Sequence, residues 1–354
     1  MTTVIKNGTV YQNGHLIKAD VLIDGQKIKA IGTDLEGEET IDASGMIVSP
    51  GLVDVHVHYR DPGQTYKEDI KTGSQAAARG GFTTVGAMPN VTPVPNTAEL
   101  MEKMVRENQK KGLVHILQYG PVTKDETTDI IPDYAELKKA GAFALSNDGH
   151  GVQSAQTMYL AMQKAKENNL IIAVHAQDDS LFNKGIVNEG VAAEKLDLPP
   201  VTELAETTQI ARDLLLAQKT RVHYHICHVS TKTSVELVRL AKARGIKVTC
   251  EVAPHHILLT DSDIPEDNAY FKMNPPLRSK EDQAALLVGL LDGTIDLIAT
   301  DHAPHAKAEK QGGMREAAFG ITGSETAFST LYTRFVKEEK VFTLDYENDL
   351  ERTY

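Results

Sequence analysis

Histidine and aspartate side chains close several apolar runs of this chain. His56 and His58 end the run 51–58, and Asp301 ends another at 295–301. In an extended strand, residues two apart point the same way, so His56 and His58 project together from an otherwise apolar segment. Two imidazoles that project together can bind one divalent cation, which predicts a hydrolytic metal site.

Further residues of ligand type follow other apolar runs. The full set is His56, His58, Asp148, His175, His228 and Asp301. One divalent ion needs only three or four protein ligands, so four imidazoles and two carboxylates are better explained by two ions that share one carboxylate. Two ions about 3.5–4 Å apart would hold a shared hydroxide ready for attack. Each of these residues on its own is more often structural. Metal ligation is favoured because all six lie at or just after the ends of apolar runs.

The elements that must position these residues alternate in type. Eight apolar runs are candidate strands, at 51–58, 82–88, 113–119, 142–146, 170–176, 221–228, 247–253 and 295–301. Helical patterns occur at 67–79, 97–110, 154–168, 203–218, 231–244 and 323–338. Eight strands with interleaved helices predict a (β/α)8 TIM barrel, with the ligand set at the carboxyl ends of the strands. A doubly wound sheet is the alternative, but it would need a phosphate-binding glycine loop where this chain has two histidines and an arginine.

The first fifty residues differ from the rest of the chain. Short alternating runs, separated by Asn-Gly and Asp-Gly turns, predict a small antiparallel β domain of sandwich type at 1–50. The barrel is expected over 51–340, and a short tail follows at 341–354. Within the barrel, the polar stretch 302–320 is long enough to act as a mobile lid over the mouth.

Composition argues against several classes of function. The 354 residues include 37 Lys plus Arg against 49 Asp plus Glu, and the net charge of −12 argues against nucleic acid as a partner. The N-terminus lacks a signal-peptide pattern and no apolar run reaches about 18 residues, so we expect a cytoplasmic protein that does not enter a membrane. Cys227 and Cys250 lack CxxC spacing and are expected to be buried reduced thiols.

The other histidines have no geometric argument of their own. A structural role is the default for an isolated histidine. It is therefore expected for His15, His115, His150, His223, His225, His255, His256 and His302. His150 and His302 are near enough to the predicted mouth of the barrel to stay open questions.

Several motifs resemble those of one enzyme family, and the match extends over almost the entire chain. They lie at 54–68 (DVHVHYRDPGQTYKE), 87–90 (AMPN), 273–278 (MNPPLR) and 301–305 (DHAPH). They closely resemble the motifs of bacterial class I dihydroorotases, which belong to the amidohydrolase superfamily. Related allantoinases and hydantoinases share the His-x-His but generally lack an arginine at the place of Arg60, and typically use a carboxylated lysine as the bridging ligand. The fourth predicted strand offers no lysine at its end, and Asp148 takes that place.

The resemblance implies a role for each ligand. One zinc ion would be held by His56, His58 and Asp301, and a second by His175 and His228, with Asp148 and a hydroxide shared between them. The implied reaction is reversible hydrolysis of (S)-dihydroorotate to N-carbamoyl-L-aspartate in pyrimidine (UMP) synthesis. Asp301 would also take the proton of the hydroxide and return it to the leaving nitrogen.

The resemblance also implies the substrate contacts. Arg60 carries a rigid guanidinium suited to bidentate capture of the substrate carboxylate, and Asn90 and His305 would add hydrogen bonds. Asn274 would contact the ring amide, and backbone groups around Phe319 and Gly320 would complete the pocket. The implied set is His58, Tyr59, Arg60, Asn90, Asn274, His305, Phe319 and Gly320.

Two departures from the family pattern leave alternatives open. Asn147 stands before the bridging aspartate, where an acidic residue is usual. Family members also continue for several tens of residues past 338, so the small β domain is expected to be incomplete at its C-terminus. The chain could then be a weakly active or inactive subunit that serves as a structural partner of aspartate carbamoyltransferase. A hydantoinase-like or allantoinase-like amidase is a further alternative, and a homodimer is an option because dimers are common in the family.

Overall fold

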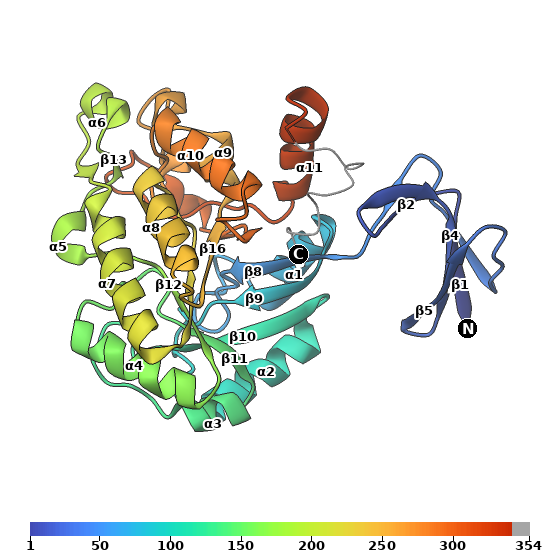
Figure 1. The fold of residues 1–354 in the computed structure, drawn as a ribbon, viewed down its shortest axis with the longest axis horizontal. Helices are drawn as coiled ribbons and strands as arrows, with labels where there is room; N and C mark the ends of the chain where they lie inside the picture. Colours follow the sequence, from blue (N-terminus) through green and yellow to red (C-terminus); the bar gives the residue numbers. More distant parts are fainter. Residues whose placement is uncertain (342–354) are drawn as a thin grey trace. The chain divides into compact units, whose positions relative to one another are not determined.

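The computed structural model describes residues 1–341, and the chain divides into two compact units (Figure 1). One unit comprises Met1–Leu52 together with the described residues from Thr330 to 341, and the other comprises Val53–Ser329. The boundaries expected at residues 50 and 340 stay predictions. Most of the expected tail at 341–354 lies outside the described residues.

The N-terminal strands form two small sheets. The first has the order β5 (Lys27–Gly32), β4 (Asp20–Asp24), β1 (Thr2–Lys6), β6 (Glu39–Asp42), and the second β3 (His15–Lys18), β2 (Thr9–Gln12), β7 (Ile47–Val48). The turn between β2 and β3 places both Asn13 and Gly14 at positive φ, a conformation that Asn-Gly adopts readily. The pairs β1–β6 and β2–β7 are parallel, so these sheets are mixed where the sequence predicted an antiparallel domain. Local turn signals cannot reveal such pairs because their strands are distant in sequence.

Eight parallel strands form the barrel of the second unit. Their order is β8 (Leu52–Val57), β9 (Phe82–Ala87), β10 (His115–Pro121), β11 (Ala142–Ser146), β12 (Ile171–Val174), β15 (His223–Ile226), β16 (Val248–Val252) and β17 (Leu297–Ile298). The first and last strands approach each other through a single bridge between Val57 and His302. The side chain of Asp54 also accepts the backbone N–H of Thr300 at 3.0 Å. The barrel is therefore nearly closed, and the predicted fold class is confirmed.

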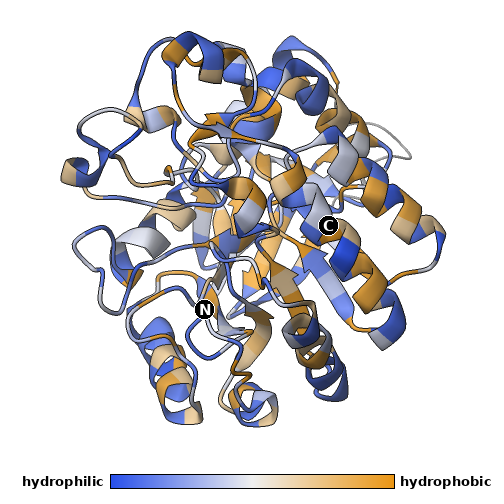
Figure 2. Ribbon diagram, turned by 90° about the vertical axis from the view of Figure 1, so that its left-hand side faces the viewer, coloured by the Kyte–Doolittle hydropathy of each residue, from blue (hydrophilic) through white to orange (hydrophobic). Residues whose placement is uncertain are grey.

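Helices cover the outside of the barrel (Figure 1). They include α1 (Ile70–Arg79), α2 (Ala98–Lys111), α3 (Tyr134–Lys139), α4 (Ala155–Glu167), α7 (Leu204–Thr220), α8 (Lys232–Ala243) and α10 (Lys280–Leu291). Asp69, Thr97, Ser154 and Ser279 cap four of these helices by accepting a backbone N–H of the first turn. Hydrophobic residues are concentrated on the central strands, and hydrophilic residues on much of the helical exterior (Figure 2).

Two insertions extend the carboxyl end of the barrel. One, between β12 and α7, contains α5 (Asp179–Phe182), β13 (Val187–Asn188), α6 (Val191–Leu196) and β14 (Pro200–Val201). The other, between β16 and α10, contains α9 (Pro254–Leu258), η1 (Asp261–Asp263) and η2 (Ala269–Phe271). The buried guanidinium of Arg278 joins them by donating to the side chain of Asn188 and the carbonyl of Val201. These contacts fix the segments that border the barrel mouth.

The segment after β17 begins with buried residues and contains the short helix η3 (Lys307–Lys310). The ammonium of Lys310 donates to the carbonyls of Lys272 and Ala318, which ties this segment to its neighbours. Its action as a lid stays a prediction. The helix predicted at 323–338 is α11 (Ala327–Leu331) followed by a π-helical turn, η4 (Tyr332–Glu338). Within residues 1–341, the helices fall short of the length and apolar character that crossing a bilayer requires.

Candidate active site

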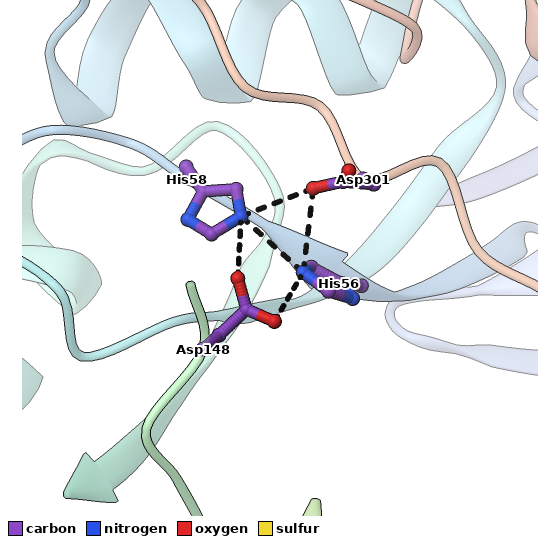
Figure 3. Close-up of side chains that lie close together, drawn as sticks. All are labelled: His56, His58, Asp148 and Asp301. Atoms are coloured by element: carbon purple, nitrogen blue, oxygen red, sulfur yellow. Dashed lines mark hydrogen bonds and ion pairs between the residues drawn. The ribbon is translucent and has the colours of Figure 1, made fainter. Parts of the chain in front are cut away.

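The carboxyl ends of β8, β11 and β17 bring four predicted ligands together (Figure 3). The Nε2 atoms of His56 and His58 lie 3.2 Å apart. Asp301 places Oδ1 at 3.1 Å from His58 Nε2 and 3.4 Å from His56 Nε2. Asp148 contacts the same two nitrogens at 3.2 and 3.4 Å, through its two different oxygens. All four side chains are buried and converge on one centre.

The remaining two predicted ligands adjoin the same carboxylate. His175 follows β12 and His228 follows β15, and His175 Nδ1 lies 3.0 Å from His228 Nε2. His228 Nε2 is 3.5 Å from Asp148 Oδ1. Asp148 therefore belongs to two groups of ligand atoms, one with His56, His58 and Asp301 and one with His175 and His228.

This arrangement suits bound cations. Of two imidazole nitrogens that face each other at about 3 Å, at most one can donate a hydrogen bond while the other accepts it. Asp148 Oδ1 is buried and has no hydrogen-bond partner among residues 1–341. A positive ion between these atoms would satisfy the orphaned oxygen and the facing lone pairs together. Imidazole nitrogens and carboxylate oxygens are ligands that zinc accepts readily, so the buried group is a metal-site candidate.

The local electrostatics favour ionised carboxylates and a neutral His175, whereas the neighbouring Asp148 outweighs burial and raises the pKa of His56 and His228. Burial raises the pKa of Asp301, but the hydrogen bond from His58 and the charge of His56 outweigh it and lower the pKa below its usual value. Burial also raises the pKa of Asp148, but the charge of His56 and the nearby side chain of His228 outweigh it and lower the pKa below its usual value. Burial and the neighbouring His228 lower the pKa of His175 to about 4. Ionised carboxylates and neutral imidazoles are the forms that bind metal ions.

Three polar side chains orient the imidazoles from behind. His56 Nδ1 lies 2.5 Å from Glu251 Oε1, and His58 Nδ1 lies 2.9 Å from Asn90 Oδ1. His175 Nε2 lies 3.1 Å from Gln177 Oε1. A hydrogen bond at one ring nitrogen fixes the tautomer that leaves the other free for a ligand. The sequence interpretation missed Glu251 and Gln177, although a glutamate inside the apolar run 247–253 was a signal that could have found the first.

Comparison with known proteins decides the family of this site. A family model described as Dihydro-orotase-like matches residues 45–234. A dihydroorotase of Lactobacillus johnsonii is 97% identical over 345 residues, which cover 98% of this chain and 81% of the relative. A dihydroorotase of Lactobacillus gasseri is 90% identical over the same shares. The chain belongs to the dihydroorotase family. The expected enzyme class, a hydrolase of the dihydroorotase type, is thereby confirmed.

Solved structures show that the dihydroorotase family shares its fold with related amidohydrolases. The L-hydantoinase (dihydropyrimidinase) of Arthrobacter aurescens superimposes with a TM-score of 0.85 at 26% identity, covering 99% of this chain and 80% of that chain. The D-hydantoinase (dihydropyrimidinase) of Thermus sp. gives 0.78 at 26% identity, covering 95% and 77%. The fold alone therefore does not separate these enzymes, whereas the sequence identity to dihydroorotases does.

The residues that resemblance to dihydroorotases assigns to substrate binding lie on two sides of the ligand group. The guanidinium of Arg60 is buried, and its Nε donates to the carbonyl of Pro304 at 3.3 Å. His305 Nε2 is 2.7 Å from the carbonyl of Phe319, next to Gly320. Burial and the positive charges of Arg60 and Lys67 lower the pKa of His305 to about 4, which keeps its ring neutral. The guanidinium of Arg60 and the neutral imidazole of His305 thus lie near each other.

Asn274 lies on the side of His175. Its amide nitrogen donates to Gln177 Oε1 at 2.7 Å and lies 3.2 Å from His175 Nε2. Asn90, by contrast, accepts from His58 and reaches the backbone carbonyl of Asp148 at 3.4 Å. Both amides therefore also hold the ligands in place.

Tyr59 is placed differently from its neighbours in the motif. Its ring packs against the backbone of Gly73 in α1, where a Cβ at residue 73 would come within 2.4 Å of it. Successive strand residues point to opposite sides, so Tyr59 turns away from His58. Any contact of Tyr59 with a molecule bound among the ligands would have to come from its backbone.

The two open histidines are settled by their surroundings. His302 Nδ1 accepts the backbone N–H groups of Gly323 and Ser324, so its Nε2 donates to Glu68 at 3.1 Å. His302 therefore ties the segment after β17 to the loop before α1, while His150 is exposed to solvent. Cys227 and Cys250 are free and buried, as expected.

Asn147 has a structural role that an acidic residue could not fill. Its side-chain oxygen accepts the backbone N–H groups of Val122 and Thr123 at 2.9 and 3.0 Å. Its amide nitrogen donates to the hydroxyl of Thr123 and to the carbonyl of Glu126. The amide thus fixes the loop after β10 directly beside Asp148.

Proposed function

We propose that this member of the dihydroorotase family catalyses the reversible hydrolysis of the cyclic amide in (S)-dihydroorotate to N-carbamoyl-L-aspartate, with two zinc ions. The observation that carries the proposal is the sharing of Asp148 between two groups of buried ligand atoms. The buried Arg60 supports the choice of an anionic substrate. A cytoplasmic location belongs to the same proposal because the substrate is a small soluble anion.

The residues divide between the two proposed ions as the contacts divide. His56, His58 and Asp301 would hold one ion, His175 and His228 the other, and Asp148 both. When bound, the two ions would supply an activated water and polarise the carbonyl of the ring amide. Glu251, Asn90 and Gln177 would keep the imidazoles turned toward them.

Asp301 is the proposed proton carrier. Its carboxylate is ionised because the hydrogen bond from His58 and the charge of His56 outweigh burial and lower its pKa. It can therefore accept a proton from the attacking water and hold it at a carboxylate oxygen. Delivery of that proton to the ring nitrogen then lets the amide bond break without expelling a nitrogen anion.

The remaining polar groups would bind and orient the substrate. Arg60 can pair with its carboxylate through two parallel N–H donors, and the ring of His305 would line the pocket beside it. Asn274 would face the ring amide, with the backbone at Phe319 and Gly320 along the edge of the pocket. Asn90 and the backbone at Tyr59 would complete the set of contacts.

The deciding experiment measures metal content and hydrolysis of dihydroorotate in one purified sample. We expect about two zinc ions per chain and turnover that Asp301→Ala abolishes. Asp292→Ala, which changes a surface aspartate paired with Arg239, is the control and should leave turnover unchanged. Turnover that survives Asp301→Ala would contradict the proposed role of Asp301.

Two outcomes would favour the alternatives. Bound metal without turnover would favour the subunit interpretation, and addition of aspartate carbamoyltransferase would then be the next step. Faster turnover of hydantoins than of dihydroorotate would favour a hydantoinase, a possibility that the shared fold keeps worth testing.

A further inference from the structure

The interior of the barrel beneath the ligands is polar on the side of β15 and β16. Interiors of such barrels are usually filled by branched apolar side chains. Tyr224 points outward, since its hydroxyl donates to Asp213 of α7, so the alternating neighbours His223 and His225 point inward. On β16, Thr249 and Glu251 face these histidines. Buried polar groups cost stability unless they are hydrogen-bonded. The polar column formed by His223, His225, Thr249 and Glu251 must therefore be hydrogen-bonded within the barrel.

The column is a continuous chain of hydrogen bonds. His223 Nε2 lies 2.9 Å from the hydroxyl of Thr249, which is also 2.9 Å from His225 Nδ1. His225 Nε2 lies 3.0 Å from Glu251 Oε2, and Glu251 Oε1 lies 2.5 Å from His56 Nδ1. The chain begins at the first residue of β15, which is half-buried, and ends at a fully buried predicted ligand near the carboxyl end of β8.

The donors of the chain point toward Glu251 from both ends. A carboxylate only accepts, and Glu251 also receives the backbone N–H of His228 at 3.3 Å. His225 must then donate from Nε2, which leaves its Nδ1 to accept from the hydroxyl of Thr249. The oxygen of Thr249 in turn accepts from His223 Nε2. At the other end His56 donates from Nδ1, so its Nε2 is directed toward Asp148 and Asp301.

We propose that His225, Thr249 and His223 are positioning residues that hold Glu251, and through it His56, in the orientation and tautomer that ion binding requires. Without the donor of His225, one oxygen of the buried Glu251 loses its side-chain partner and the carboxylate gains freedom to turn away from His56. The inference rests on the proposed function only in that His56 binds an ion. It extends the set of functional residues across the barrel, to histidines for which the sequence predicted structural roles.

The test compares variants of the chain in the intact protein. His225→Ala removes the donor, His225→Gln restores a donor near the same place, and His115→Ala at the exposed start of β10 is the control. Zinc affinity is measured by competition with a chelator, and the tautomer of His56 by nitrogen-15 NMR of the metal-free protein. We expect His225→Ala to weaken binding of the ion at His56 and His58 about 10–100-fold and His225→Gln to regain most of it. The NMR signal of the Nδ1–H of His56, which donates to Glu251, should weaken in His225→Ala.

Each outcome bears on the inference separately from the proposed function. Unchanged zinc affinity and an unchanged tautomer in His225→Ala would overturn the inference while leaving the proposed function intact. Failure of the unaltered protein to bind zinc would overturn the proposed function, and the tautomer of the metal-free protein would still test the inference. If His225→Ala does not fold, Thr249→Val and Thr249→Ser replace it. The valine variant should weaken binding and the serine variant should not, and equal affinities would overturn the inference.

Discussion

The two imidazole pairs of the candidate site are supported in different ways. His56 and His58 face two carboxylates, and Glu251 stands behind His56. His175 and His228 share only Asp148, and the support behind His175 is the neutral amide of Gln177. A carboxylate behind an imidazole raises its basicity more than an amide does. The comparison teaches that the two proposed ion positions would differ in affinity through residues that touch neither ion.

Removing the carboxylate of Asp148, which both groups of ligands share, should abolish binding at both ion positions. Asp148→Ala is expected to lose both ions and to lower kcat/KM by more than about 10⁴-fold, beyond the usual contribution of a single acid–base group. Metal analysis after dialysis and a rate assay test this. His150→Ala, two residues away and exposed, is the control. One fully retained ion would show that Asp148 is not shared.

Removing the proposed proton carrier, Asp301, should affect only the ion position at His56 and His58. Asp301→Asn keeps an oxygen and the size of the side chain but cannot hold the transferred proton, so kcat should fall about 10²–10⁴-fold. The ion between His175 and His228 should stay bound, which metal analysis can show. A rate within tenfold of the unaltered protein would contradict this assignment.

Chelation should release the two ions in order. The position with two carboxylates and the backing of Glu251 should bind at least about 10-fold more tightly, the lower range for such orienting partners. A titration with chelator, followed by metal content per chain, is therefore expected to show a plateau near one ion. Loss of both ions in a single step would mean that the two positions do not differ in affinity.

The smallest effects should come from the two amides behind the histidines. Gln177→Ala is expected to weaken only the ion at His175 and His228, about 10-fold, and Asn90→Ala only the other ion, by a similar factor. The two variants are matched controls for each other in the same chelator titration. Equal weakening of both ions by either variant would mean that the positions are not independent.

Much of the barrel could be predicted because its strands are apolar and regularly spaced. Seven of the eight predicted runs contain the observed strands, and the run 113–119 ends two residues before β10 does. Helix α10 was missed because its segment AALLVGLL is apolar on every side and shows no helical period. Helix α3 was missed because its six residues span fewer than two turns. The parallel pairs of the N-terminal sheets depend on contacts distant in sequence, which local patterns do not carry.

The candidate site shows the same difference between what local patterns predict and what depends on contacts distant in sequence. The six ligand candidates were predictable because each follows a recognisable strand, and the barrel gathers strand ends at one mouth. The direction of Tyr59 and the partners of Glu251 and Gln177 depend on which side chains meet across neighbouring strands. Asn147 illustrates the limit, since the sequence showed only a missing charge, whereas the structure shows four hydrogen bonds.

The near-closure of the barrel at Val57 and His302 also has a consequence for biosynthesis. A nascent chain exposes His56 and His58 early, but Asp301 leaves the ribosome only after some 245 further residues have been translated, the sequence distance between residues 56 and 301. The ligands converge only when the first and last strands meet. A half-synthesised polypeptide therefore offers only fragments of the candidate site, and tight binding of an ion there would mark a chain whose barrel has been completed.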